Sequence, residues 1–158
     1  MRVVIGSDHA GFELKQTLVD YVRNLGHEVL DVGTDGPDPV DYPDFAAKVG
    51  KAILGRESDR GILICGSGVG ASVSANKIPG IRAAVCHDCY SSRQGVEHDD
   101  MNVLVLGARI VASSLAKDLA RIFLAAEFTG EERHRRRLEK ISALEKNFNS
   151  MPQIGITM

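Results

Sequence analysis

Five short apolar runs alternate along the chain with stretches in which apolar residues recur at helical spacing. The runs are rich in Val, Ile and Leu and do not alternate with polar residues, which is typical of strands buried on both faces of a sheet. They are Val3–Ile5, Glu28–Val32, Gly61–Cys65, Ile81–Cys86 and Asn102–Leu106. Because strands and helices alternate, the pattern predicts a Rossmann-like α/β fold, a three-layer α/β/α sandwich around a five-stranded parallel sheet.

The helical stretches each place an apolar stripe on one side of the expected helix. The first stripe stops before Gly26, a residue type that commonly ends helices. The stripes are Leu14, Leu18, Val22 and Leu25; Phe45, Val49, Ala52 and Ile53; and Leu115, Leu119, Ile122 and Phe123. A polar helix is expected from Glu131 to Asn147, and Thr34–Pro39 has the composition of a loop. We therefore expect one domain over residues 1–147 and a C-terminal tail over residues 148–158.

The composition narrows the classes of function. The chain has 158 residues, 44% of them hydrophobic, which suffices for a single domain with its own core. Its formal net charge is −2, whereas nucleic-acid-binding proteins are usually basic. No apolar run approaches the roughly 20 residues that a membrane helix needs, so we expect neither nucleic acid nor a membrane as partner. Three cysteines, an odd number, argue against a disulfide framework and fit a reducing cytoplasm.

Residues able to do chemistry follow most of the predicted strands. Asp8-His9 follows the first strand, Tyr42 comes after the second, Cys65 ends the third and Arg109 follows the fifth. In open parallel sheets, ligands bind outside the carboxyl ends of the strands. We therefore expect an active site at this edge of the sheet.

The glycine-rich loop Gly66–Gly70 joins Cys65 to a helix expected from about Ala71 to Lys77. Glycines let backbone N–H groups converge on a ligand, and a helix N-terminus adds positive partial charge, so the loop favours an anion. Two other interpretations are open: a tight turn, or a weak dinucleotide fingerprint with Asp88 about twenty residues further on. Cys65 is either a base or nucleophile beside these amides or a buried thiol of the core.

Two clusters pair imidazoles with carboxylates, namely Asp8-His9 and His98-Asp99-Asp100. Histidine is the side chain best suited to proton transfer near neutral pH, so the clusters favour acid–base chemistry. The pair Cys86 and Cys89 has the spacing of a redox couple or of half a zinc site, although no second such pair exists in the sequence.

One basic concentration lies near the C-terminus. Arg133 and Arg137 are four residues apart and share a helix face, with His134 beside them. These groups form either a clamp for a phosphate group or a solvated helix face balanced by nearby glutamates.

Taken in order, the motifs closely resemble the ribose-5-phosphate isomerase B family, from residue 2 to about residue 147. They are Gly6-Ser7-Asp8-His9-Ala10-Gly11-Phe12, Asp41-Tyr42-Pro43, the stretch from Cys65 to Gly70, Ala75-Asn76-Lys77, Glu97-His98 with Asn102-Val103-Leu104, Gly107-Ala108-Arg109, and Arg133-His134 with Arg137. The resemblance implies reversible conversion of ribose 5-phosphate to ribulose 5-phosphate without a metal or other cofactor. It also implies the sheet order 2-1-3-5-4.

The resemblance assigns catalytic roles to matched positions. Cys65 matches the base that carries a proton between C2 and C1 through an enediolate. His98 matches the residue that opens the furanose ring, and Asp8 matches a residue that handles a sugar hydroxyl. The anion hole for the enediolate oxygen matches Ser67 and the amides of Gly66, Gly68, Val69 and Gly70.

Further positions match residues that bind the sugar phosphate. They are His9, Tyr42, Asp99, Arg133, His134 and Arg137. Arg109 matches a residue that reaches the phosphate of the neighbouring subunit. The resemblance therefore implies a homodimer, or a dimer of dimers, with its active site at the subunit interface.

Asp99 departs from the family pattern, because many relatives carry Asn at that position. An amide can donate a hydrogen bond to a sugar oxygen, whereas an ionised carboxylate cannot. Ser67 stands where Thr is frequent, and it keeps the hydroxyl. A six-carbon phosphosugar isomerase, acting on allose 6-phosphate or galactose 6-phosphate, and a non-catalytic phosphosugar- or nucleotide-binding module both remain as alternatives.

Overall fold

The computed structural model describes residues 1–150 and contains one parallel sheet of five strands. The strands are β1 (Arg2–Ser7), β2 (Glu28–Asp31), β3 (Arg60–Cys65), β4 (Ala83–Val85) and β5 (Val103–Gly107). Their order across the sheet is β2-β1-β3-β5-β4. The fold class and the strand order expected from the sequence are therefore confirmed.

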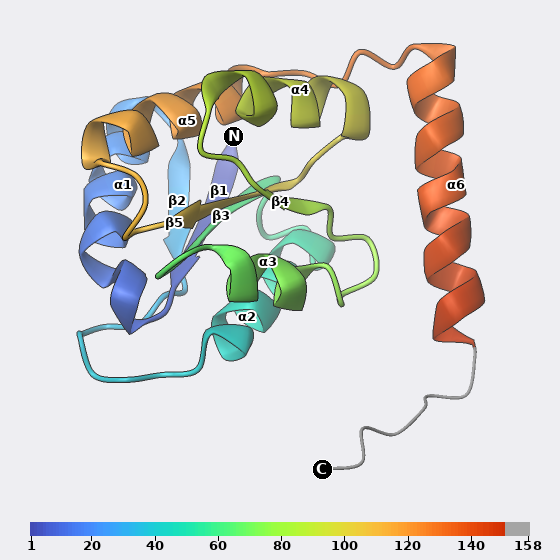
Figure 1. Cartoon of the computed structure of the whole chain (residues 1–158). Helices are drawn as coiled ribbons and strands as arrows, with labels where there is room; N and C mark the ends of the chain where they lie inside the picture. The colour runs from blue at the N-terminus through green and yellow to red at the C-terminus, as the bar shows by residue number, and fades with distance from the viewer. Residues whose placement is uncertain (151–158) are drawn as a thin grey trace.

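Helices cover both faces of the sheet, as Figure 1 shows. They are α1 (Phe12–Asn24), α2 (Tyr42–Leu54), α3 (Val69–Ala75), α4 (Cys89–Asp99), α5 (Ser113–Ala125) and α6 (Glu132–Asn149), with a short 3-10 turn at His9–Gly11. Helices α1, α4 and α5 pack on one face, and α2 and α3 pack on the other. This is the three-layer arrangement that alternating strands and helices predict.

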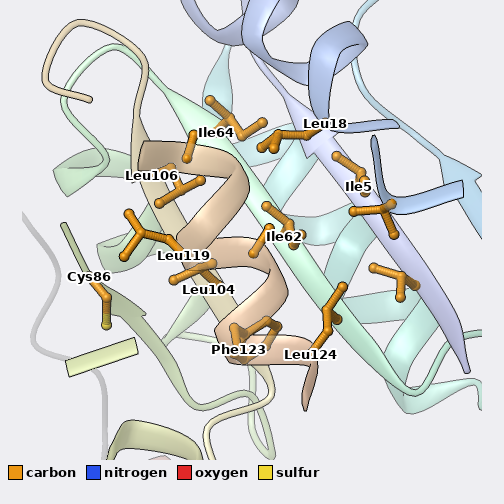
Figure 2. Close-up of a cluster of buried hydrophobic side chains, with 14 of the residues drawn as sticks. Ile5, Leu18, Ile62, Ile64, Cys86, Leu104, Leu106, Leu119, Phe123 and Leu124 are labelled. Carbon is orange, nitrogen blue, oxygen red and sulfur yellow. The ribbon is translucent and has the colours of Figure 1, made fainter. Parts of the chain in front are cut away.

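Successive residues of each interior strand serve two separate cores. In β1, Val3 and Ile5 pack toward α1 and α5, whereas Val4 packs toward α2 and α3. Figure 2 shows the first core, where Leu119 and Phe123 of α5 lie against the side chains of β3 and β5. Because both faces are covered, the interior strands are apolar throughout, which explains why their runs do not alternate.

The two edge strands differ from the prediction of strands buried on both faces. Residues of β2 are mostly exposed, and its charged ends, Glu28 and Asp31, were the available signal. Strand β4 is only three residues long and half-buried. The amide of Asn76 bonds both the N–H and the C=O of Ala83, so a side chain replaces the missing neighbouring strand there.

Several element boundaries also differ. Leu25 is exposed because α1 ends at Asn24 and the chain turns at Gly26, whose φ is +87°. Helix α3 begins at Val69, two residues before the expected start, because Gly68 takes a left-handed conformation and ends the loop early. Helix α6 reaches Asn149, so it extends into the stretch expected as a tail. The remaining tail lies outside the described residues.

Helix α6 stands apart from the sandwich and runs alongside it (Figure 1). Its one buried side chain among the described residues is His134, and Glu145 accepts a hydrogen bond from the backbone N–H of Gly80. The apolar residues Ile141, Leu144 and Phe148 are exposed. Within residues 1–150, no helix combines the length and the apolar character that crossing a bilayer requires.

Candidate active site

A cavity of about 350 Å³ opens at the carboxyl edge of the sheet. It lies where β1, β3 and β5 end and where α2 begins. Its lining consists of Asp8, His9, Ala10, Tyr42, Cys65, Gly66, Ser67, Gly70, Arg109 and Ile110. The structure thus brings together most of the residues that the sequence placed at this edge.

The thiol of Cys65 lies at the base of the glycine loop and is 4% exposed. The backbone N–H of Gly68 donates a hydrogen bond to Cys65 Sγ over 3.2 Å. The next amide, that of Val69, donates to Ser67 Oγ over 3.3 Å. Gly68 has a φ of +85°, a conformation that L side chains rarely adopt, and this turn directs its N–H at the sulfur.

Asp8 and His9 enter the cavity from the end of β1. Asp8 is 6% exposed and accepts a hydrogen bond from the N–H of Gly11, which caps the 3-10 turn. His9 Nδ1 accepts a hydrogen bond from the N–H of Val40 over 3.2 Å, so the neutral ring carries its proton on Nε2. Both side chains are therefore held in place by backbone groups.

Tyr42 and Arg109 form the outer walls of the cavity. The ring of Tyr42 lies so close to Gly70 that an added Cβ there would come within 2.7 Å of it. The guanidinium of Arg109 lies over Gly66, where an added Cβ would be 3.4 Å away. The loop glycines thus admit these two side chains to the cavity wall.

Five of the expected site residues lie away from the Cys65 cavity. His98, Asp99, Arg133, His134 and Arg137 are absent from the lining of the Cys65 cavity. The helix α4 connects the parallel strands β4 and β5, so it runs in the opposite direction to them. Its C-terminal end therefore lies near the amino ends of the strands. Arg82, just before β4, bonds Asp100 through both its Nε and Nη2 atoms, which ties the end of α4 to that edge.

His98 and His134 form a stacked pair at the junction of α4 and α6. Their ring centroids are 4.2 Å apart, with an angle of 27° between the planes. Gln94 Nε2 lies 2.8 Å from His98 Nδ1, and Thr129 Oγ1 lies 2.7 Å from His134 Nδ1. Loss of hydration on burial, and then the neighbouring His98 ring, lower the pKa of His134. The His134 ring therefore takes up a proton only at a lower pH than a free imidazole does.

Arg133 and Arg137 are exposed on the first turns of α6. Arg133 Nε pairs with Glu131 over 2.9 Å, so this arginine has a carboxylate beside it in the single chain. His134, by contrast, is 1% exposed and turned inward, and its Nε2 has no hydrogen-bond partner among the described residues. The three residues expected as a phosphate clamp are thus two exposed cations and one buried ring.

Comparison with known proteins gives the family. The model of the ribose/galactose isomerase family matches residues 3–141 of the chain. The chain belongs to the ribose/galactose isomerase family. It is 45% identical over 148 residues to ribose-5-phosphate isomerase B of Escherichia coli, which covers 94% of this chain and 99% of that protein. It is 42% identical over 132 residues to D-erythrulose-4-phosphate isomerase of Pectobacterium atrosepticum, covering 82% of this chain and 86% of that one.

A solved structure agrees with this membership of the ribose/galactose isomerase family. Ribose-5-phosphate isomerase B from Clostridium thermocellum superposes with a TM-score of 0.91 at 50% sequence identity. The match covers 94% of this chain and 99% of that chain. As a member of the family, the chain is an isomerase with the family's α/β fold.

Asp99 is exposed at the last position of α4. It lines a different cavity of about 350 Å³ with Met101, Ile141 and Leu144 among its neighbours. In the single chain its carboxylate therefore does not face Cys65.

The pair Cys86 and Cys89 shows no disulfide, since both thiols are free. Burial, and then the charge of Asp88, raise the pKa of Cys86 to about 11, so this thiol stays protonated at neutral pH. Asp88 itself accepts from the N–H of Ser91 and caps α4. Among the described residues, no group of three or more His, Cys, Asp or Glu side chains could hold a metal ion.

Three contacts, two of them made by expected site residues, were not predicted from the sequence. Gln94 touches His98 and Thr129 touches His134, as described above. His87 Nε2 accepts a hydrogen bond from the N–H of Gly107, beside the glycine loop. The spacing of four residues between Gln94 and His98 was an available signal, because such pairs meet on a helix.

Proposed function

We propose that the chain interconverts ribose 5-phosphate and ribulose 5-phosphate through an enediolate, with Cys65 as the base. The observation that carries this proposal is the thiol of Cys65, which lies in a cavity at the carboxyl edge and accepts a hydrogen bond from the loop amide of Gly68. The names of the relatives from E. coli and C. thermocellum support the choice of substrate.

The reaction needs a base at carbon and stabilisation of a developing oxyanion. In the forward direction the Cys65 thiolate takes the proton from C2 of the open aldose, and electron density moves onto the C1 oxygen. The proton of the C2 hydroxyl passes to the C1 oxygen, the C2 carbonyl forms, and the Cys65 thiol returns its proton to C1, which gives the ketose and restores the thiolate. Ser67 and the amides of the loop Gly66–Gly70 stabilise the oxyanion, while Asp8 bonds a sugar hydroxyl.

The phosphate and the ring oxygen need groups that the Cys65 cavity of one chain lacks. We propose that a second copy of the chain supplies them, with His98 opening the furanose ring and Arg133, His134 and Arg137 holding the phosphate. Arg109 would reach the phosphate of the neighbouring subunit, so each site would use both chains. Exposed apolar side chains support such an interface, namely Val69, Val73, Tyr90, Ile110, Ile141, Leu144 and Phe148.

Asp99 keeps three other substrates open as alternatives to ribose 5-phosphate. A carboxylate accepts hydrogen bonds only, so it would select a sugar that presents a hydroxyl donor at that place. The relative named D-erythrulose-4-phosphate isomerase supports a family in which the substrate varies. Erythrulose 4-phosphate and the six-carbon sugars allose 6-phosphate and galactose 6-phosphate are therefore the second set to assay.

The experiment is a coupled assay for ribulose 5-phosphate formed from ribose 5-phosphate, run in EDTA. Wild type should turn over, and Cys65→Ala should lose about 100- to 10,000-fold in kcat, the usual contribution of a general base. Cys89→Ala is the matched control, because this thiol is exposed and lies outside the cavity.

Three outcomes would count against the proposal. A wild type inactive on ribose 5-phosphate but active on another phosphosugar would replace the substrate and keep the base. A Cys65→Ala variant with full turnover would remove Cys65 from the mechanism. Binding of sugar phosphates without turnover of any of them would favour a non-catalytic module.

A further inference from the structure

Gln94 lies four residues before His98 on α4, so the two side chains share one face of the helix. Gln94 Nε2 is 2.8 Å from His98 Nδ1, and the contact is partly buried. The nitrogen of a side-chain amide has hydrogen-bond donors and no acceptor. Nδ1 therefore accepts this bond, and in the neutral ring the proton lies on Nε2.

A second contact fixes the plane of the same ring. His134 stacks on His98 with the centroids 4.2 Å apart, and Thr129 Oγ1 lies 2.7 Å from Nδ1 of His134. Stacking restrains the tilt of the His98 ring, and the bond from Gln94 restrains its rotation in the plane. The two contacts together leave one orientation and one neutral tautomer.

We propose that Gln94 is a positioning residue that holds His98 in the Nε2–H tautomer, so that this imidazole meets the substrate as a hydrogen-bond donor. The proposal rests on the proposed function for the identity of the substrate. A donor at Nε2 is suited to the ring oxygen of a furanose or to an oxygen on which negative charge develops. A neutral ring protonated on Nδ1 would instead present the lone pair of Nε2 to the substrate, and this nitrogen could only accept a hydrogen bond.

The first test reads the tautomer without any turnover. Protein labelled with ¹⁵N at histidine is examined by NMR at about pH 9, where imidazoles are ordinarily neutral. Of the five histidines, His98 is assigned by the signals lost in His98→Gln. Wild type should show a protonated Nε2 and an unprotonated Nδ1 for His98. In Gln94→Glu the carboxylate can only accept, so the proton should move to Nδ1.

The second test measures turnover of the same proteins in the isomerase assay. Gln94→Glu should lose at least about 100-fold in kcat, since a histidine held in the wrong tautomer is costly in catalysis. Gln94→Leu, which holds neither tautomer, should lose about 10-fold. Gln16→Glu and Gln16→Leu are matched controls on α1, where Gln16 is exposed, and they should match wild type in both tests.

The outcomes separate this proposal from the proposed function. A wild type that turns over no phosphosugar contradicts the proposed function, while the NMR result still decides the tautomer. A His98 tautomer that is the same in wild type, Gln94→Leu and Gln94→Glu overturns the positioning role. So does full turnover in a Gln94→Glu protein whose tautomer has changed. Thermal melting of each variant shows whether a loss of turnover reflects a loss of fold.

Discussion

Tyr42 and Gly70 show how a single missing side chain shapes the candidate site. The ring of Tyr42 occupies the space where a Cβ on residue 70 would stand, with its nearest atom 2.7 Å from that position. Tyr42 is 41% exposed, so its ring can swing outward when it is displaced. The contact therefore determines the shape of the cavity wall more than the stability of the fold.

We expect Gly70→Ala to lower kcat/KM by about 10-fold or more with little change in melting temperature. The added methyl group displaces Tyr42, and misplacement of a substrate-positioning group by about 1 Å can cost up to about 100-fold. Steady-state kinetics and thermal melting check both halves of the prediction.

Two controls isolate this effect at the residue scale. Gly36→Ala should match wild type, because nothing lies within 4 Å of a Cβ at that position. In a Tyr42→Ala background, Gly70→Ala should have little further effect, because the group it displaces is gone. An unchanged effect in that background would show that Gly70 acts through something other than Tyr42.

At the scale of elements, α1 is joined to β2 by a partly buried ion pair. Lys15 Nζ lies 2.7 Å from Asp31 Oδ2 and 3.0 Å from Oδ1. The two partners differ in environment, because the Lys15 side chain is 1% exposed and that of Asp31 is 27% exposed. Removing either partner leaves a charge behind, and the cost depends on how well water reaches the charge that remains.

We expect Asp31→Asn to lower the free energy of unfolding by about 3 kcal/mol or more, since it leaves the buried ammonium of Lys15 without a countercharge. Lys15→Met should cost less, because the remaining carboxylate is partly hydrated. The double variant should recover part of the loss caused by Asp31→Asn. Urea unfolding at one fixed protein concentration measures all three, and a larger cost for Lys15→Met than for Asp31→Asn would contradict the argument.

The junction of α4 and α6 should make stability depend on pH. Burial lowers the pKa of His134, so the folded chain takes up a proton on this ring at a lower pH than the unfolded chain does. Below the ordinary imidazole pKa of about 6.5, the unfolded state binds more protons and gains stability relative to the folded state. The contribution is therefore present above that pH and is lost as the pH falls below it.

We expect wild type to lose more stability than His134→Gln between about pH 7.5 and pH 5.5. Urea unfolding at the two values measures this difference. His27, whose pKa burial also lowers, is present in both proteins and cancels in the comparison. Arg136→Gln, an exposed change on the same helix, should follow wild type. Equal losses in wild type and His134→Gln would show that His134 does not cause the pH dependence.

The same elements show what the sequence could predict. Strands β1, β3 and β5 were predicted with their burial, because two covered faces require continuous apolar runs. The strand β2 was also predicted, but its exposure was not, because its place at the edge of the sheet depends on the strand order. Most residues of the Cys65 cavity were also predicted, because ligands bind at the carboxyl ends of the strands in open parallel sheets. The stack of His98 on His134 could not be predicted, since it depends on how α6 folds back onto α4.

At the scale of the whole molecule, α6 is a long helix with little to pack against in its own chain. Glu145 accepts a hydrogen bond from the N–H of Gly80, which attaches the helix to the sandwich, while Leu144 and Phe148 are 56% and 64% exposed. Isolated helices are marginal in water, and most helical stability in proteins comes from packing of an apolar face. A second copy that covers this face would also bring the residues of α4 and α6 to a partner's cavity.

A shared site makes a quantitative prediction for mixtures of two inactive variants. Cys65→Ala and His98→Gln each lack one half of the proposed machinery, so each homodimer should be inactive. In a mixed dimer, one site combines both altered residues and the other combines the native Cys65 of one chain with the native His98 of its partner. Random exchange makes half of the dimers mixed, and each then has one working site of two, so activity should recover to about one quarter of wild type.

The measurement needs exchange between subunits and a control for it. The two variants are unfolded together in urea, refolded at equal concentration and assayed, and each variant alone is carried through the same steps. Mixing Cys65→Ala with Cys65→Ser serves as the matched control, since no combination restores a native Cys65. If each site lay within one chain, the mixture of Cys65→Ala and His98→Gln would stay inactive, because every chain would still lack one of its own residues. Recovery to about one quarter would therefore place the two residues of each site on different chains.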